Sequence, residues 1–494
     1  MDDYEAYDVV VIGSGPGGEG AAMQAAKAGC KVAVVERYAR VGGACTHLGT
    51  IPSKTLRNMA HRFMEFQNEP LFHAYLDQSK INFPDFLRRS ESVIAAQVKM
   101  RSGHYTRNDI EVIHGTARIQ DRYLVEVDRS VAHKPTMYLR AKYIVLATGS
   151  RPHRPADFAN IHRNIYDSDT VLNLKSNPRV VTIYGAGVVG CEYTSIFKTL
   201  GKKVYLINTK NSLLDFLDCE IRDALTYHLR DQGVIIRNGE KLTGIDCDKQ
   251  ELVLHLESDK KIYTDILLFA TGRIGNTENL GLENVGLSAN SRGHITVNAH
   301  YQTNTKNIYA VGDITGFPSL ASSAYDQGRF AARHLIDPNC SDCLVKDVPV
   351  GIYTSPEISC LGKTEEELTH EKIPYEVGHA SFRHLARAQI CDNTTGMLKL
   401  LFHRDSLEIL GIHCFGRIAC EIVHIGQVVM SNPAPHNTLK YFVNTTFNYP
   451  TMAEAYRVAA LNGLNRVRLH SDQHVKPLGE LEYTRQANLD QMTM

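Results

Sequence analysis

The sequence lacks the features that would assign a protein to a membrane, to nucleic acid or to the secreted class. Its 54 basic residues are balanced by 54 acidic residues, so no net field attracts nucleic acid or an anionic membrane. No apolar run approaches the roughly 20 residues of a membrane-spanning helix. The start, Met1-Asp2-Asp3-Tyr4-Glu5, lacks the basic region and the apolar core of a signal peptide. We therefore expect a cytoplasmic protein with no membrane or nucleic-acid partner.

Paired cysteines are also missing. The 11 cysteines are odd in number and scattered over 494 residues, which argues against a secreted disulfide framework. Cys340 and Cys343 form the only CxxC, and a tetrahedral zinc site needs four ligands. No second CxxC and no spaced histidine pair accompany them, so we predict no metal site and interpret both as connector thiols.

What the sequence does contain is a Gly-rich turn between two apolar strands. Residues 7–12 form a short apolar run that is rich in β-branched residues, which predicts a buried parallel strand, and the Ala-rich residues 19–28 favour a helix. Between them stands Gly13-Ser14-Gly15-Pro16-Gly17-Gly18, and a second predicted strand at 31–35 ends in Glu36. This is the complete fingerprint of a dinucleotide-binding unit rather than a lone GxGxxG.

Each part of the fingerprint has a physical task. Gly13 permits the tight turn, Gly15 lets a pyrophosphate approach the backbone, and Gly18 allows the helix to pack closely on the strand. The helix N-terminus offers unpaired N–H groups and about half a positive charge to the phosphates. Glu36 stands where a carboxylate accepts hydrogen bonds from a ribose.

The same unit occurs again in the middle of the chain. A predicted strand at 180–184 runs into Gly185-Ala186-Gly187-Val188-Val189-Gly190. A predicted helix and a second strand follow, and that strand ends in Asn208-Thr209-Lys210, where the first unit has Glu36. Two such units imply two bound dinucleotides, or one that is held permanently and one that exchanges.

A later strand closes each unit with the same turn. The first closes in Ala147-Thr148-Gly149 and the second in Ala270-Thr271-Gly272-Arg273, and a third apolar strand runs into Gly312-Asp313. After residue 348 the pattern changes to alternating strands, and residues 397–403 and 407–414 predict a hairpin.

The order of these elements predicts an α/β protein with two dinucleotide-binding domains and a C-terminal α+β domain. We expect the first domain at 1–155 and 282–345, the second at 156–281 and the third at 346–470. Residues 471–494 lose apolar periodicity, which predicts a polar tail.

These ordered motifs resemble the two-dinucleotide flavoprotein family that includes glutathione reductase and dihydrolipoyl dehydrogenase. The resemblance covers nearly the whole chain up to Arg468 and includes both Gly-rich turns and both Ala-Thr-Gly turns. It also rests on Val41-Gly42-Gly43-Ala44-Cys45, Ile51-Pro52-Ser53-Lys54 and Ala310-Val311-Gly312-Asp313. The resemblance implies that the first unit holds FAD tightly, that the second binds a nicotinamide nucleotide, and that the third domain forms a homodimer or a larger homo-oligomer.

The resemblance also implies roles for single residues. Asp313 would bind the ribityl chain of FAD, and Lys54 would lie beside the N5 edge of the flavin and pair with Glu192. A cation there stabilises negative charge on a reduced flavin. The other cofactor contacts that the resemblance implies come from the Ala-Thr-Gly turns, at Thr148, Gly149, Gly272 and Arg273.

Two departures from the family pattern concern thiol chemistry. The disulfide reductases carry C-x4-C, but this sequence has Cys45 and then Thr50, whose hydroxyl cannot form a disulfide. They also carry a terminal His-Pro motif where this chain has Tyr449-Pro450, and tyrosine, with an ordinary pKa of about 10, is a poor acid or base at neutral pH. We therefore expect that no disulfide is reduced. Cys45 is then a packing residue near the flavin, with a redox role as the alternative.

Within the family, the chain resembles the soluble pyridine nucleotide transhydrogenases at 49–54, 206–209 and 444–450. This resemblance implies reversible hydride transfer from NADPH to NAD through FAD, in a ping-pong sequence at one nucleotide site. Asn208 fits a site for both NAD and NADP, because an uncharged side chain does not repel the 2′-phosphate. Lys210 would supply a nearby cation. The alternative is that both are ordinary loop residues.

Two other functions stay open at the level of sequence. One is an NAD(P)H-dependent flavin reductase of a non-disulfide acceptor such as a quinone or a metal ion, whose acceptor pocket the sequence neither shows nor excludes. The other is a non-catalytic flavoprotein, against which the intact second Gly-rich unit and Lys54 argue.

Overall fold

The structure is a computed structural model that describes residues 4–69, 83–130, 133–155, 158, 163–248, 251–341 and 344–472. These residues form two compact units. The first comprises the chain up to Leu213 together with Leu229–Lys346, and the second comprises Leu214–His228 and the chain from Asp347. Cys343, the predicted domain boundary at 155–156 and the predicted tail from residue 473 lie outside the described residues.

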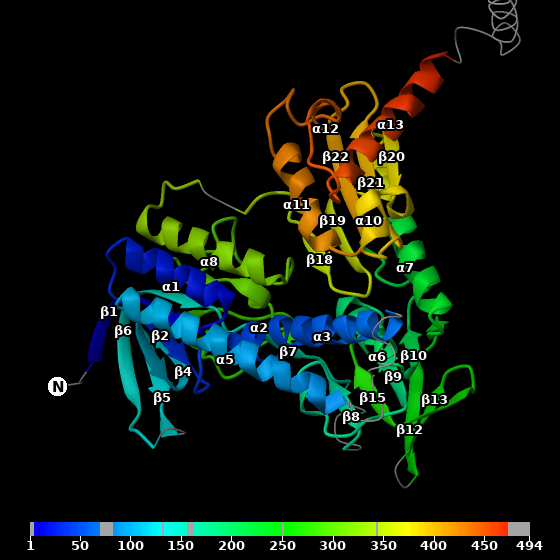
Figure 1. Cartoon of the computed structure of the whole chain (residues 1–494). Helices are drawn as coiled ribbons and strands as arrows, with labels where there is room; N and C mark the ends of the chain where they lie inside the picture. The colour runs from blue at the N-terminus through cyan, green and yellow to red at the C-terminus, as the bar shows by residue number, and fades with distance from the viewer. Residues whose placement is uncertain are drawn as a thin grey trace, which may run out of the picture. The chain divides into compact units, whose positions relative to one another are not determined.

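The first dinucleotide-binding region is built on a seven-stranded sheet. β1 pairs in parallel with β2 and β6, β2 continues to β3, and β17 pairs in parallel with β6. β5 and β4 extend the sheet in antiparallel fashion. Helices α1 and α8 pack side by side (Figure 1). The bounds are β1 Tyr4–Ile12, α1 Pro16–Lys27, β2 Val32–Glu36, β3 Glu111–His114, β4 Thr116–Asp121, β5 Leu124–Asp128, β6 Met137–Leu146, β17 Ile308–Ala310 and α8 Ala321–Ile336.

The second region of the same unit repeats this design. Five parallel strands follow the order β11-β10-β9-β15-β8, beside an antiparallel sheet β12-β13-β14 and a two-stranded ribbon β16-β7. The bounds are β7 Ser150–Pro152, β8 Ile165–Asp167, β9 Val180–Tyr184, α6 Val188–Thr199, β10 Lys203–Asn208, β11 Ile235–Asn238, β12 Leu242–Asp248, β13 Glu251–Leu256, β14 Lys261–Thr264, β15 Ile266–Phe269 and β16 Arg273–Gly275.

Two helices of the first region also reach α6 of the second region. Helices α3 (Thr50–Asn68) and α5 (Phe83–Arg107) pack on one another, and α3 contacts α6. The rings of Phe83 and Phe197 stack with centroids 5.1 Å apart, which adds an apolar contact between α5 and α6. The short segments of this unit are α2 Gly43–His47, η4 Val171–Asn173, η5 Leu282–Val285 and η6 Gly312–Thr315.

Both dinucleotide helices begin directly at the Gly-rich turn, and α1 begins three residues earlier than the predicted helix at 19–28. In α1 the first position is Pro16, whose fixed φ and missing N–H suit the start of a helix. In α6 the first residue is Val188, after Gly187. The turn and the helix N-terminus therefore form one continuous feature.

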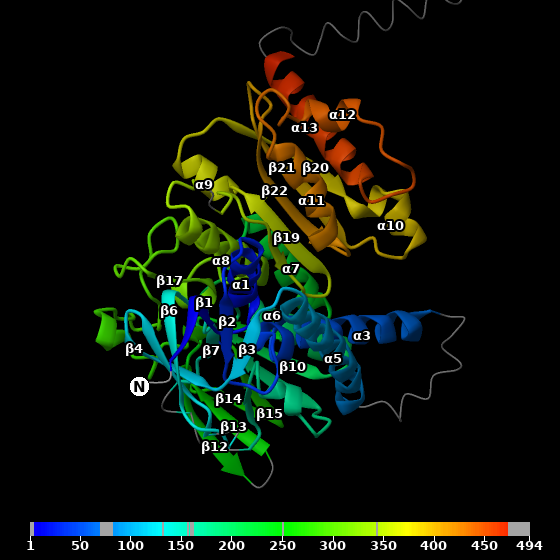
Figure 2. The same cartoon turned by 90° about the vertical axis from the view of Figure 1, so that its left-hand side faces the viewer.

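The second unit is a five-stranded antiparallel sheet that carries helices on both faces. Its strand order is β18-β19-β22-β21-β20, and α11 and α13 pack against it (Figure 2). Phe402, Ile412 and Tyr456 are among the side chains buried between sheet and helices. The bounds are α7 Cys219–Asp231, β18 Val350–Ile352, β19 Glu357–Gly362, α9 Glu365–His370, β20 Tyr375–Ser381, η7 Phe382–His384, α10 Ala386–Ile390, β21 Gly396–His403, β22 Ile409–Gly416, α11 Ala419–Met430, α12 Lys440–Asn444 and α13 Glu454–Asp472.

The predicted α/β architecture is confirmed, with two dinucleotide-type sheets and an α+β region near the C-terminus. The predicted hairpin is also present, because β21 and β22 pair in antiparallel register with Met397 opposite Phe415. Among the described residues, no helix is both long enough and apolar enough to cross a bilayer.

Candidate functional site

In the first Gly-rich turn, close backbone contacts leave no room for a side chain at Gly13 or at Gly18. Gly13 has φ +108°, and a Cβ on it would lie 2.3 Å from the carbonyl oxygen of Ala147. A Cβ on Gly18 would lie 1.9 Å from the carbonyl oxygen of Gly13. The two tasks that the sequence predicts for these glycines, the tight turn and the close packing of helix on strand, therefore both have a steric basis.

The middle glycine has space around it. A Cβ on Gly15 would meet nothing nearer than the Cα of Gly43, at 3.9 Å. No side chain caps the N-terminus of α1, which begins immediately after Gly15. An open backbone at an uncapped helix N-terminus suits the phosphates of a dinucleotide.

The second turn has the same geometry. Gly185 has φ +110°, and its Cβ would lie 2.4 Å from the carbonyl oxygen of Ala270. A Cβ on Gly190 would lie 1.8 Å from the carbonyl oxygen of Gly185, while one on Gly187 would meet nothing within 4 Å. No side chain caps α6 either. The chain thus contains two equivalent turns of the kind that suits dinucleotide phosphates, which we call the first cradle (Gly13–Gly18) and the second cradle (Gly185–Gly190).

Glu36 also organises the turn. Its carboxylate is buried and accepts hydrogen bonds from the backbone N–H of Ser14 at 3.1 Å and of Tyr38 at 2.9 Å. The Ser14 hydroxyl donates to the same carboxylate and accepts the backbone N–H of Gly42 at 2.9 Å. The end of β2, the first turn and the Gly42-Gly43 segment are therefore held together around one charge.

Lys54 and Glu192 join the two regions. The Lys54 ammonium donates to both carboxylate oxygens of Glu192, at 2.8 and 2.6 Å. The Glu192 side chain is 5% exposed and that of Lys54 is 27% exposed. Lys54 belongs to α3 and Glu192 lies two residues after Gly190 in α6, so the pair lies close to the second cradle.

Cys45 and Thr50 are brought together although no disulfide is possible. Burial raises the pKa of the Cys45 thiol, and a hydrogen bond with the Thr50 side chain opposes that shift. The same pKa is raised further by Asp313 and lowered by Lys54. Cys45, Thr50, Lys54 and Asp313 therefore share one neighbourhood, as the resemblance implies.

Asp313 is held by a chain of polar contacts. The hydroxyl of Ser150 donates to its carboxylate and accepts from Nε of Arg273 at 2.7 Å. Nε of Arg273 also lies 4.0 Å from the Asp313 carboxylate, and Nη1 of Arg273 lies 3.5 Å from the Asp169 carboxylate. Burial raises the pKa of Asp169, while Arg273 lowers it.

Ser150 and Asp169 belong to this network of polar contacts, and sequence reasoning did not single them out. The signal for Ser150 was its place directly after the first Ala-Thr-Gly turn, equivalent to that of Arg273 after the second. No sequence signal marked Asp169.

Each Ala-Thr-Gly turn is hydrogen-bonded to the residue that directly follows the short strand after the other turn. The hydroxyl of Thr148 donates to the carbonyl oxygen of Asn276 at 2.7 Å, and the carbonyl of Gly149 accepts the N–H of the same residue at 2.9 Å. In the second turn the Thr271 hydroxyl donates to the carbonyl of His153, whose N–H donates to the carbonyl of Gly272. These hydrogen bonds therefore connect the first dinucleotide-binding region to the second.

Asn208 is more deeply engaged in its loop than the sequence suggests. Its side chain is buried, and its amide nitrogen donates to the Ser212 carbonyl at 2.8 Å and to Oδ1 of Asn238 at 3.2 Å. Its amide oxygen accepts the N–H of Lys210 at 3.1 Å. The Lys210 side chain is exposed. Asn208 thus shapes the loop that follows β10 and adds no charge to it.

Comparison with known proteins places this geometry in a family. The profile of the pyridine nucleotide-disulphide oxidoreductases matches residues 7–328, and that of their dimerisation domain matches residues 348–460. The chain is 58% identical to a soluble pyridine nucleotide transhydrogenase of Ectopseudomonas mendocina, over 93% of this chain and 99% of the relative. It is 55% identical to the protein of the same name in Vibrio parahaemolyticus, over 93% of this chain and 98% of the relative.

Solved structures resemble the whole fold. The HOCl-induced flavoprotein disulfide reductase RclA of Escherichia coli superposes with a TM-score of 0.83 at 26% identity, over 92% of this chain and 99% of that one. LpdA of Mycobacterium tuberculosis superposes with a TM-score of 0.84 at 23% identity, over the same shares of both chains. The similarity to LpdA is evidence for the fold alone.

The Lys54–Glu192 pair predicts a measurable contribution to stability. Lys54→Met removes the ammonium that neutralises a buried carboxylate. We therefore expect the free energy of unfolding to fall by about 2 kcal/mol, which lies between the values for surface and for buried ion pairs. The double variant Lys54→Met/Glu192→Leu should regain part of this loss. Unfolding of the holoenzyme in urea measures both. The exposed pair Lys142–Asp8 is the control, and an equal loss in Lys142→Met would contradict the assignment.

The raised pKa of Cys45 predicts slow alkylation at neutral pH. A thiol whose pKa is raised stays protonated, so its reaction with iodoacetamide should accelerate only above the ordinary thiol pKa of about 8.5. The exposed Cys247 serves as an internal reference. Mass spectrometry of alkylated peptides over a pH series gives both midpoints, and a midpoint for Cys45 below that of Cys247 would refute the prediction.

Proposed function

The chain belongs to the pyridine nucleotide-disulphide oxidoreductase family, and we propose that it transfers hydride reversibly from NADPH to NAD with FAD as a tightly bound cofactor. The observation that carries the proposal is the pair of equivalent phosphate cradles at Gly13–Gly18 and Gly185–Gly190, joined by the Lys54–Glu192 ion pair. The names of relatives 55% and 58% identical to this chain support the same reaction.

The residues of the first region fit FAD. The uncapped N-terminus of α1 and the open Gly15 would hold the pyrophosphate, and the Glu36 carboxylate would meet the adenosine ribose. Thr148 and Gly149 would line the site, and Asp313, oriented by Ser150, would bind the ribityl chain. Lys54 would place its ammonium beside the isoalloxazine ring, where a cation favours the reduced form. When bound, FAD supplies a ring system that accepts a hydride and gives it up again.

The second region would bind NADPH and NAD in turn. The open Gly187 and the uncapped N-terminus of α6 would receive the pyrophosphate, and Gly272 and Arg273 would border the site from the facing turn. With FAD held in the first cradle, the two nicotinamide nucleotides would share the second, so the order of binding would be ping-pong. The product of the first half-reaction must leave before the acceptor enters.

Asn208 lets this site accept both nucleotides. An acidic residue at the end of β10 would repel the 2′-phosphate of NADPH. Asn208 is neutral and its amide is bound within the loop, so it excludes neither nucleotide. Lys210, two residues on, would provide positive charge near a 2′-phosphate without requiring one.

We propose that no redox disulfide takes part. Cys45 lies against Thr50, whose hydroxyl accepts no electron pair, and the thiol is kept protonated by burial. These two residues then form a polar contact beside the flavin rather than a relay. We further propose a cytoplasmic homodimer or larger homo-oligomer, which the match of residues 348–460 to a dimerisation domain supports.

Anaerobic stopped-flow measurement tests the reaction. NADPH should bleach the flavin absorbance, and NAD added after removal of NADP should restore it, with NADH formed in equal amount. A flavin that stays reduced until a quinone, a ferric chelate or oxygen is added would instead identify a reductase of that acceptor. A flavin that neither NADPH nor NADH bleaches would mean a non-catalytic flavoprotein.

A substitution at Asn208 tests the dual specificity. Asn208→Asp adds a negative charge near the 2′-phosphate and should raise the KM for NADPH about tenfold more than that for NADH, which corresponds to about 1.4 kcal/mol. Asn208→Leu has nearly the same shape and, like Asn208→Asp, loses the two hydrogen bonds that the amide nitrogen donates. It also loses the acceptor for the N–H of Lys210 but adds no charge, so it is the control and should affect both nucleotides alike. Steady-state kinetics with each nucleotide decides, and equal changes in Asn208→Asp would reject the charge argument.

A further inference from the structure

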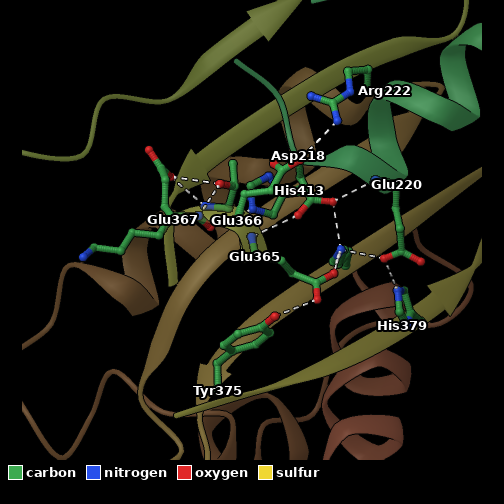
Figure 3. A network of polar contacts seen from close by, with 12 residues as sticks. Asp218, Glu220, Arg222, Glu365, Glu366, Glu367, Tyr375, His379 and His413 are labelled. Carbon is green, nitrogen blue, oxygen red and sulfur yellow. Dashed lines mark hydrogen bonds and ion pairs between the residues drawn. The ribbon is translucent and has the colours of Figure 1, made fainter. Parts of the chain in front are cut away.

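Lys399 lies at the centre of a group of carboxylates in the second unit. It belongs to β21, and its side chain has no exposed surface. Its ammonium lies 2.8 Å from Oδ1 of Asp218 and 2.6 Å from Oε2 of Glu220, and it also donates to Glu365. We call these four residues the Lys399 cluster, and Figure 3 shows its three carboxylates in their surroundings.

The cluster is closed by further polar contacts. His379 contacts Glu220 at 2.9 Å, and the Tyr375 hydroxyl donates to Glu365 at 3.1 Å (Figure 3). The Asp218 carboxylate also accepts the backbone N–H of Glu220 at 3.2 Å and of Glu365 at 3.3 Å.

The three carboxylates lie close enough together to ligate a metal ion, but the Lys399 ammonium contacts all three and provides the cation itself. Burial lowers the pKa of Lys399, and hydrogen bonds to the three carboxylates outweigh it and raise the pKa above its ordinary value. The charge at the centre is therefore permanent at neutral pH.

The cluster joins three separate parts of the chain. Lys399 comes from β21 and Glu365 from the first turn of α9, whereas Asp218 and Glu220 come from residues 214–228. A second ion pair supports the same attachment, because Arg222 donates to Glu366 at 3.1 Å. Residues 214–228 are thus fixed to the second unit by two sets of charges.

In sequence, this segment interrupts the second dinucleotide-binding region. The chain leaves the first unit after Leu213 and returns at Leu229, between β10 and β11. Helix α7 spans that return, since residues 219–228 belong to the second unit and residues 229–231 to the first. A continuous helix is stiff, so the C-terminal end of the segment cannot move independently of the part of α7 that lies in the second unit.

The residues directly before the segment form the loop at the nucleotide site. Asn208 donates to the Ser212 carbonyl at 2.8 Å, and Asn238 donates to the Asn211 carbonyl at 2.9 Å. We call residues 208–212 the coenzyme loop. Asp218 follows its last residue by six positions, and β11, which contains Asn238, begins four positions after α7 ends. The loop is therefore connected to the anchored segment covalently through Leu213, and hydrogen bonds with Asn238 connect it to the strand that follows α7.

We propose that the Lys399 cluster is a positioning device for the coenzyme loop: by holding residues 214–228 in the second unit, it keeps the loop in the conformation that binds the adenosine end of NADPH and NAD. This inference rests on the proposed nucleotide site in the second region. Lys399, Asp218, Glu220 and Glu365 are positioning residues that act through the chain and contact no substrate. Loss of the cluster weakens nucleotide binding and leaves the transfer step unaltered in the bound complex.

Nucleotide binding by cluster variants tests the proposal. Lys399→Met and the milder Glu220→Gln are prepared as FAD-loaded full chains. We expect Lys399→Met to raise the Kd for NADP by at least about fivefold, the lower end of typical coupling between sites, and Glu220→Gln to raise it less. Equilibrium dialysis gives the Kd, and stopped flow gives the rate of flavin bleaching at saturating NADPH, which should stay at the wild-type value.

Leu398→Ala is the matched control, because it removes a buried side chain from the same strand without touching the cluster. It should lower the thermal midpoint and leave the Kd unchanged. An unchanged Kd in both cluster variants, or an equal rise in Leu398→Ala, overturns the proposal. If Lys399→Met does not fold, Glu220→Gln decides, since Glu220 is partly exposed. A wild-type enzyme that binds NADP but transfers no hydride contradicts the proposed function and leaves this binding test intact.

Discussion

Glu192 lies in the first turns of α6 with only 5% of its side chain exposed, and it can do so as an anion because Lys54 brings an ammonium from α3. Removing one partner from such a pair leaves a charge in a region that water barely reaches, so the two helices must keep their mutual position. The first cradle, the Cys45–Thr50 contact and the second cradle are arranged around these helices. The ion pair is therefore the interaction on which the geometry of the site depends.

The backbone at the two cradles adds a second constraint of a different kind. Gly18 and Gly190 approach carbonyl oxygens so closely that a single Cβ would overlap them, and that approach brings each helix N-terminus to the ends of the strands. The Lys54–Glu192 ion pair fixes the position of a positive charge, and the glycines of the two turns leave room for phosphate groups. Together they support the proposed site for two dinucleotides, and Thr50 has no thiol with which Cys45 could form a disulfide. This combination supports the proposed transfer of hydride from NADPH to NAD through FAD.

Local patterns predicted most of the fold and suggested the main residues of the proposed site. The β-branched runs, the Gly-rich turns and the hairpin at β21 and β22 are each encoded within about 30 residues, the size of one βαβ unit, and all are present. The contacts that the sequence could not predict join distant positions. Ser150 reaches Asp313 and Arg273, and Lys399 reaches Asp218, across more than a hundred residues of chain in each case. No periodicity marks such a pair before the chain has folded.

The sequence by itself determined the two dinucleotide-binding units, the neutral Asn208 after the second, and the absence of a cysteine partner for Cys45, because each depends on residue type at a short spacing. Only the tertiary structure decided that Asn208 is bound within its own loop, that Ser150 and Arg273 hold Asp313, and that residues 214–228 pack with the second unit. The physical reason is that buried charges and amides must find partners wherever the packed chain supplies them. The fold as a whole determines which partners are available to a buried group, and no local stretch of sequence specifies them.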